Sequence, residues 1–512
     1  MPGRHIAFQA AGAVADATGR LGQGLELEAD YVVVGSGAGG SAAAITLQRG
    51  GFSTILIESG PWRDPEDYPS SMYGTMRDMF TDWGQLIATG DSIIPVVQAQ
   101  LVGGTPVINS AIVVRTPGDV LQDWRDRLGL GDAFSERKIG DAQDKIEQQL
   151  KITQIPVDVL GPTTQRMLDG FQRVSIEGHI ITRNVHDCQG SMQCLQGCRN
   201  RAKQTPNITW IPELMALGGH VLSCAPVHRV RVEKGQAVGV HGWFRHPENR
   251  SKGEAFSVRA KRGVLVAASA TGSAPLLMRS GLDLPYLGQG WRAHPGAGVV
   301  GIYPDFMDMH KGPSQAAASI HHRLDVGIKM EHLSLPLELF AARVGGGGSV
   351  LMNKLEEYRH CAMWVTAVRA QAVGRLRHGW LGTRLHYVPT AEDLSRLRFG
   401  TKLLARMHFE AGAERVWHGV YGLKPEITKD ELDLIDQAPL DNKAWTWVLS
   451  HLFGGCVLGT DPATSVVGPD LHVHGVRRLH VVDASAIPTT LGVNPQHTIM
   501  AMAMVTAQTI AG

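Results

Sequence analysis

The sequence predicts an α/β fold in which a doubly wound, Rossmann-like domain is joined to a second domain built on an antiparallel sheet. A β-branched apolar run at residues 31–34 is followed at once by a glycine-rich turn and a helix of small residues. A second apolar strand, residues 54–57, then ends in Glu58. The chain of 512 residues exceeds one ordinary core, so a second domain is expected.

Gly35, Gly37 and Gly40 form a GxGxxG pattern between the first strand and the helix. Gly35 permits a tight turn, Gly37 lets the backbone approach a pyrophosphate, and Gly40 lets the helix pack closely on the sheet. The helix N-terminus offers free N–H groups to an anion. Glu58, 18 residues after Gly40, is placed to accept hydrogen bonds from a ribose diol. The pattern predicts dinucleotide binding and does not distinguish FAD from NAD.

The composition is that of a soluble globular protein, 43% hydrophobic and 19% charged. The 49 basic residues balance the 48 acidic ones, so no overall field attracts nucleic acid or an anionic membrane. The sequence contains no run of about 18 apolar residues, so no transmembrane helix is expected. Residues 1–24 lack the features of a signal peptide and predict a weakly helical extension, or an arm packing on a partner subunit. With six cysteines and no disulfide framework, we expect a cytoplasmic location.

Several blocks at the C-terminal end carry a more specific signal. They are residues 451–459 (HLFGGCVLG), 479–488 (LHVVDASAIP) and 492–498 (GVNPQHT). Together they resemble the closing segment of the glucose–methanol–choline (GMC) oxidoreductase family, most closely its cholesterol oxidase type and bacterial FAD-dependent alcohol and glucose dehydrogenases. Residues 103–109 and 264–273 are similar to two further flavin-binding blocks of that family.

The resemblance implies non-covalent FAD, because the 103–109 block contains no histidine to form a covalent link. Val227 would meet the adenine through its backbone, and Asp483 would lie near the ribityl chain or the pyrophosphate. Ser269 and Ala274 stand where the family more commonly has a glycine and a proline, so the resemblance does not fix the local backbone geometry there. The residues that the resemblance assigns to FAD are Gly35, Gly37, Gly40, Glu58, Gly103, Gly104, Asn109, Val227, Asp483, Asn494 and Pro495.

His451 and Asn494 match the family's histidine–asparagine pair at the reacting face of the flavin. Hydride leaves an alcohol carbon easily only when the hydroxyl proton leaves with it or before it, and a histidine is the natural base at neutral pH. The asparagine can hydrogen-bond the same oxygen and fix its orientation. The pair therefore predicts oxidation of an alcohol to a carbonyl, with hydride transfer to flavin N5. His497 is the rival histidine, and we expect it to begin the last helix and support the site.

Cys188, Cys194 and Cys198 form a C-x5-C-x3-C cluster. Its spacing resembles the iron–sulfur motif of bacterial FAD glucose dehydrogenases, and three thiolates would suit a three-iron four-sulfur cluster. Zinc is a weaker alternative that would need His186 as a fourth ligand. Related alcohol oxidases have cysteines here without a cluster, so the favoured hypothesis is three structural thiols.

The blocks that carry the resemblance are scattered along the chain, which predicts a discontinuous FAD-binding domain. We assign residues 25–117, 188–289 and 451–512 to it. Residues 118–187 and 290–450 should build the substrate domain.

The substrate is expected to be a small-molecule alcohol, bulky or apolar, with electrons passed to O2 or to an external protein or quinone. Sugar dehydrogenation with an iron–sulfur cluster, a hydroxynitrile lyase and a noncatalytic nucleotide-binding protein are the alternatives.

Overall fold

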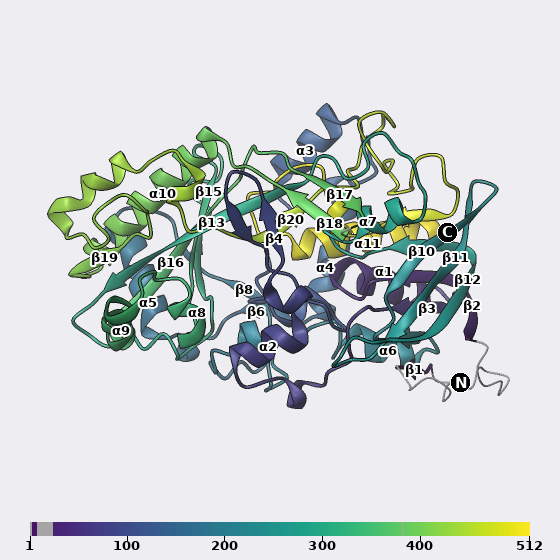
Figure 1. The fold of residues 1–512 in the computed structure, drawn as a ribbon, viewed down its shortest axis with the longest axis horizontal. Helices are drawn as coiled ribbons and strands as arrows, with labels where there is room; N and C mark the ends of the chain where they lie inside the picture. The colour runs from purple at the N-terminus through teal and green to yellow at the C-terminus, as the bar shows by residue number, and fades with distance from the viewer. Residues whose placement is uncertain (1–2, 8–23, 381) are drawn as a thin grey trace.

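The computed structural model describes residues 3–7, 24–380 and 382–512, and two large sheets dominate it (Figure 1). The first sheet has the strand order β1–β9–β3–β2–β12–β11–β10, with β21 also paired to β12. Its central pairs are parallel, while β10, β11 and β12 form an antiparallel extension. Its strands are β1 His5–Ile6, β2 Leu25–Val34, β3 Thr54–Ile57, β9 His220–Leu222, β10 Val227–Glu233, β11 Gln236–Arg245, β12 Lys252–Val266 and β21 Leu479–Val481.

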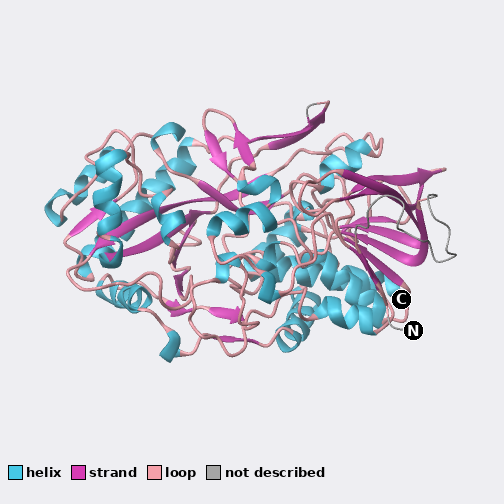
Figure 2. Ribbon diagram, turned by 60° about the horizontal axis from the view of Figure 1, so that its bottom comes forward, coloured by secondary structure: helices cyan, strands magenta, loops and turns pink. Residues whose placement is uncertain are grey.

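The second sheet is antiparallel throughout, in the order β19–β13–β16–β15–β14–β7 with β20 also paired to β13. Figure 2 shows the first sheet fanning out at one end of the molecule and the second sheet at the other. The predicted fold class, a Rossmann-like domain with an antiparallel-sheet partner, is thereby confirmed. The strands of the second sheet are β7 His179–Ile180, β13 Arg292–Ile302, β14 Ala317–Ser319, β15 Ile328–His332, β16 Cys361–Val368, β19 Arg415–Trp417 and β20 Val448–Phe453.

Two small sheets complete the strands. The four-stranded one joins β17 Arg375–Gly379, β18 Gly382–His386, β4 Ile87–Thr89 and β5 Ile93–Pro95. The two-stranded one pairs β6 Ile152–Gln154 with β8 Thr182–Asn184.

The helices cover both large sheets. The last helix, α11, packs against α1 and α4 and buries Met500, Met502 and Met504. It is the last element of the domain built on the first sheet, and it lies in the core of that domain. No helix among the described residues is long and apolar enough to cross a membrane. The helices are α1 Ala38–Arg49, α2 Met72–Met79, α3 Gly118–Arg127, α4 Glu136–Gln149, α5 Pro162–Arg173, α6 Trp210–Ala216, α7 Ser273–Arg279, α8 Leu337–Ala341, α9 Gly348–Glu356, α10 Ala391–Glu410 and α11 Gln496–Ala511.

The N-terminal segment departs from the expected weak helix where the structure describes it. His5 and Ile6 form β1, which adds a parallel strand beside β9 at the edge of the first sheet. A sheet edge offers unpaired N–H and C=O groups, and β1 satisfies some of them. The His5 ring also hydrogen-bonds Ser223 (Nε2–Oγ 2.8 Å). Residues 8–23 of the predicted extension lie outside the described residues.

Candidate active site

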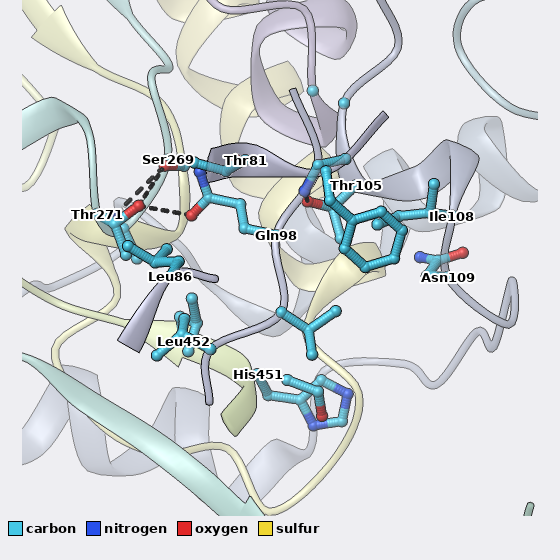
Figure 3. Close-up of a pocket in the computed structure, with 18 of the residues that line it drawn as sticks. Thr81, Leu86, Gln98, Thr105, Ile108, Asn109, Ser269, Thr271, His451 and Leu452 are labelled. Atoms are coloured by element: carbon cyan, nitrogen blue, oxygen red, sulfur yellow. Dashed lines mark hydrogen bonds between the residues drawn. The ribbon is translucent and has the colours of Figure 1, made fainter. Parts of the chain in front are cut away.

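A cavity of about 950 Å³ runs from the glycine turn after β2 to the face of the second sheet. Its size is that of a site for a large cofactor and a substrate together. Most of the residues assigned from the sequence line it, whereas Gly40 and Gly103 stand directly behind its wall. Figure 3 shows part of the cavity, with Gln98, Thr271 and Ser269 on one side and His451 below. The assigned residues on its lining are Gly35, Gly37, Glu58, Gly104, Asn109, Val227, His451, Asp483, Asn494 and Pro495.

Glu58 is buried at the end of β3 and fully hydrogen-bonded. Its Oε2 accepts from Ser36 N (3.0 Å) and Ser36 Oγ (2.7 Å). Its Oε1 accepts from Ser59 Oγ (3.0 Å) and Gly60 N (2.9 Å). Because a carboxylate has about four lone-pair directions, a ribose hydroxyl here would replace one of the two serine hydroxyls. Ser36, an unassigned position inside the glycine motif, also accepts from Gly103 N (2.9 Å) and so joins two segments that the sequence assigns to the cofactor.

The glycines of the cavity wall keep backbone close to its interior. At Gly37 an added Cβ atom would meet nothing within 4 Å, so this position opens onto the cavity. At Gly104, where φ is +62°, such an atom would lie 2.5 Å from Gly37 Cα. At Gly40 it would lie 1.8 Å from the Gly35 carbonyl oxygen, which shows how closely α1 approaches the turn. The free N–H groups of α1 therefore face a backbone-lined space that fits a pyrophosphate.

Asp483, directly after β21, fixes the opposite wall. Its two carboxylate oxygens accept from Ser485 N (2.7 Å), Ser269 N (2.8 Å) and the hydroxyls of Ser273 and Ser485. Burial raises its pKa, against these hydrogen bonds, which favour the charged form. Ser269 has φ +85°, a region that favours glycine, and its N–H is held by the Asp483 carboxylate.

His451 and Asn494 come together as the sequence predicts. His451 lies on β20 and Asn494 lies just before α11, and Asn494 Nδ2 is 3.3 Å from His451 Nε2. His294 on β13 stands opposite His451 in the strand register, with their Nδ1 atoms 3.2 Å apart. Gly492 N donates to His294 Nε2 (3.0 Å), so neutral His294 carries its proton on Nδ1.

A buried ion pair completes the group. Lys329 Nζ donates to Asn494 Oδ1 (3.0 Å) and to Glu331 Oε1 (2.8 Å), and both charged side chains are buried. Sequence reasoning missed this pair and His294. A signal existed, because two opposite charges, Lys329 and Glu331, stand two residues apart and so on the same face of β15 (IKMEH).

The histidines of this group are held neutral. Burial lowers the pKa of His451 well below 6.5, and the charge of Lys329 lowers it further. The pKa of His294 is lowered in the same way. His497 lies in the first turn of α11, as expected, but away from this group: its ring is 3.1 Å from Glu147 Oε1, within the α11–α4 contact.

The cysteine cluster does not converge as a ligand set. Among the described residues, no group of three His, Cys, Asp or Glu side chains is arranged to hold a metal ion. Cys194 Sγ instead accepts from Arg183 Nη2 (3.0 Å). Burial alone would raise the Cys194 pKa, but the charges of Arg183 and Lys203 outweigh it and lower that pKa to about 6. The three thiols are free and line one small cavity together with Arg183 and Lys203.

Family models agree with this architecture. The GMC oxidoreductase model matches residues 29–296, and its C-terminal counterpart matches residues 370–503. The chain belongs to the GMC oxidoreductase family of flavoproteins.

Relatives and solved structures extend the likeness. A GMC-type oxidoreductase of Mycobacterium tuberculosis is 31% identical over 94% of this chain and 76% of its own length. A long-chain-alcohol oxidase of Arabidopsis thaliana is 26% identical over 93% of this chain and 66% of its own. Pyridoxine 4-oxidase from Mesorbium loti matches in fold with a TM-score of 0.71 at 17% identity, covering 94% of this chain and 98% of that one.

Proposed function

We propose that this protein oxidises an apolar alcohol to a carbonyl compound, with FAD held non-covalently in the cavity. Asn494 and His451 bind the hydroxyl oxygen, and His451 takes up its proton. When bound, FAD supplies the hydride acceptor. The observation that carries the proposal is the contact between Asn494 Nδ2 and His451 Nε2 on the cavity wall, 3.3 Å apart.

The residues around FAD fit that cofactor. The open backbone at Gly37, the N-terminus of α1 and the buried Glu58 supply an anion site and an acceptor for ribose. In this chain's own chemistry, Lys329 holds the Asn494 amide so that its Nδ2 points to His451. The lowered pKa keeps His451 unprotonated and ready to accept a proton.

The contact between His294 and His451 affects which nitrogen of His451 can act as the base. Gly492 N–H donates to His294 Nε2, so His294 Nδ1–H faces His451 Nδ1, while Asn494 Nδ2–H faces His451 Nε2. A neutral imidazole has one acceptor nitrogen, so His451 accepts only one of these two hydrogen bonds. To act as a base at Nε2, His451 must carry its proton on Nδ1, where it faces the His294 proton. Leaving such a donor unsatisfied costs about 1–3 kcal/mol. A positioned base contributes about 10²–10⁴-fold, or roughly 3–5 kcal/mol, so the base role outweighs that cost.

An apolar lining supports the substrate class. Met72, Met76, Leu333, Leu335 and Met363 line the part of the cavity beyond the glycine turn. Similarity to a long-chain-alcohol oxidase points in the same direction.

The test is anaerobic visible spectroscopy of the purified protein with a panel of alcohols from ethanol to dodecanol and a sugar. The expected result is flavin bleaching that is fastest with long apolar alcohols. Restoration of the spectrum by air would indicate an oxidase, and restoration only by a quinone or dye would indicate a dehydrogenase. A flavin that stays oxidised while a cyanohydrin is cleaved would replace the proposal with a lyase.

A further inference from the structure

One face of the second sheet forms the floor of the cavity, and the cavity extends along the strands of that sheet. His294, near the start of β13, lies beside His451, whereas Met363, which lines the cavity, pairs with Val300 six residues further along the same strand. Six residues of strand span about 20 Å at about 3.3 Å per residue. The floor therefore leads from the catalytic group to a remote end of the cavity.

The remote end is apolar and is bounded by the segment after α8. Val300 pairs with Met363 across the sheet, and both pack in one cluster with Phe340 and Val344. Leu335 belongs to the same cluster and also lines the cavity. Arg343 lies between Phe340 and Val344 and lines the cavity there.

Arg343 differs from the other charged side chains of the cavity. Glu331 pairs with Lys329, Asp82 lies 3.8 Å from Arg250, and Arg279 donates to the carbonyl of His228. Glu58 and Asp483 are each hydrogen-bonded by serines.

The Arg343 side chain, by contrast, makes no hydrogen bond, ion pair or ring contact with any part of the chain that the structure describes. The side chain is nevertheless partly buried, and that burial lowers its pKa. A guanidinium withdrawn from water without a partner is unfavourable, so the position is matched to an anion that the protein itself does not supply.

We propose that Arg343 binds a carboxylate at the far end of an elongated substrate whose hydroxyl lies at His451 and Asn494. This inference rests on the proposed alcohol oxidation and adds the second end of the substrate. Arg343 would form a two-point ion pair with the carboxylate, and the leucines and methionines of the floor would cover the chain between the two ends. The substrate class is then an ω-hydroxy fatty acid.

The experiment compares kcat/KM for ω-hydroxydodecanoate with that for dodecanol in the holoenzyme. Wild-type protein should prefer the hydroxy acid, and Arg343→Met should lower that preference by about 10- to 100-fold, the range expected for a charged hydrogen bond. Arg343→Lys should restore part of it, because the charge returns without the planar fork. Arg375→Met, an exposed arginine of β17 outside the cavity lining, is the matched control and should keep the preference.

Dodecanoate, which has no hydroxyl to oxidise, separates this inference from the proposed function. Its dissociation constant, measured by perturbation of the flavin spectrum, should rise by a similar factor in Arg343→Met. A substrate preference and a dodecanoate affinity that are both unchanged in Arg343→Met would overturn the carboxylate site. If dodecanoate binding depends on Arg343 but no alcohol reduces the flavin, the carboxylate site stands and the proposed oxidation fails.

Discussion

Lys329 donates a hydrogen bond to Oδ1 of Asn494 and thereby decides which end of that amide faces His451 (Nζ–Oδ1 3.0 Å). A buried ammonium accepts no hydrogen bond, so the amide nitrogen must point the other way. The same charge disfavours protonation of His451. One side chain thus orients one half of the candidate catalytic pair and, together with burial, lowers the pKa of the other.

The pH dependence of flavin reduction should report this arrangement. Because the pKa of His451 lies well below 6.5 in the folded protein, its base form persists as the pH falls through 6.5. The reduction rate constant should therefore stay level from neutral pH to well below 6.5. In the double variant Lys329→Met/Glu331→Gln the lowering charge is gone, the His451 pKa rises, and the acid limb should move to higher pH. Stopped-flow reduction across pH measures both limbs. An acid limb at the same pH in the variant and the parent would show that Lys329 does not lower the pKa of His451.

Removing the base should slow reduction far more than it affects cofactor binding. We expect His451→Ala to lower the flavin reduction rate by about 10²-fold or more, with FAD retained. Asn494→Ala should slow it by about tenfold, the effect of losing one positioning hydrogen bond. Single-turnover kinetics and the FAD content of each variant provide the comparison. Reduction at the parental rate in both variants would place the chemistry elsewhere in the cavity.

Glu58 should contribute to FAD affinity rather than to turnover. Glu58→Gln removes the charge that the Ser36 and Gly60 donors stabilise and introduces an amide N–H toward those donors. We expect FAD affinity to fall by about 10- to 100-fold, as for the loss of charge-assisted hydrogen bonds. Fluorescence titration of apoprotein with FAD measures the affinity, and Ser59→Ala is a milder control. Equal affinities for Glu58→Gln and the parent would contradict a ribose contact.

Gly104→Ala should lower the thermal stability by more than the strain of its positive φ alone would. Its Cβ would lie 2.5 Å from Gly37 Cα, and both glycines belong to the cavity wall. Gly412→Ala is a matched control, since Gly412 also has positive φ (+98°) but nothing lies within 4 Å of its Cβ position. The control should show only conformational strain, of about 1 kcal/mol. Thermal unfolding with and without added FAD should separate the two variants, and equal Tm losses would argue against the close contact.

Local patterns made the first part of the fold predictable. The glycine turn and Glu58 lie within 24 residues of one another (Gly35 to Glu58), so sequence spacing alone describes their geometry. His294 and Lys329 could not be assigned in that way. His294 meets His451 through a strand register that joins residues 157 positions apart, and Lys329 meets Asn494 across 165. Spacing carries no information at that range, whereas opposite charges within a buried strand would have signalled an ion pair.

The short β1 strand shows a second limit. Two residues at a sheet edge carry no hydrophobic period, so the sequence around His5 and Ile6 predicts a weakly helical extension or an arm on a partner subunit and no strand. Only the exposed edge of β9 makes a strand favourable there.

The pairing of β21 with β12 has a consequence for biosynthesis. Leu479–Val481 completes the parallel sheet, and α11 then covers α1, but both segments are synthesised only after the whole of the second sheet. Until they emerge from the ribosome, the small-residue face of α1 and the edge of β12 lack their partners. The nascent chain therefore exposes apolar surface during most of its translation. The domain of the first sheet is begun first but completes its folding after the domain of the second sheet. Chaperone dependence and the supply of FAD should matter most at chain release.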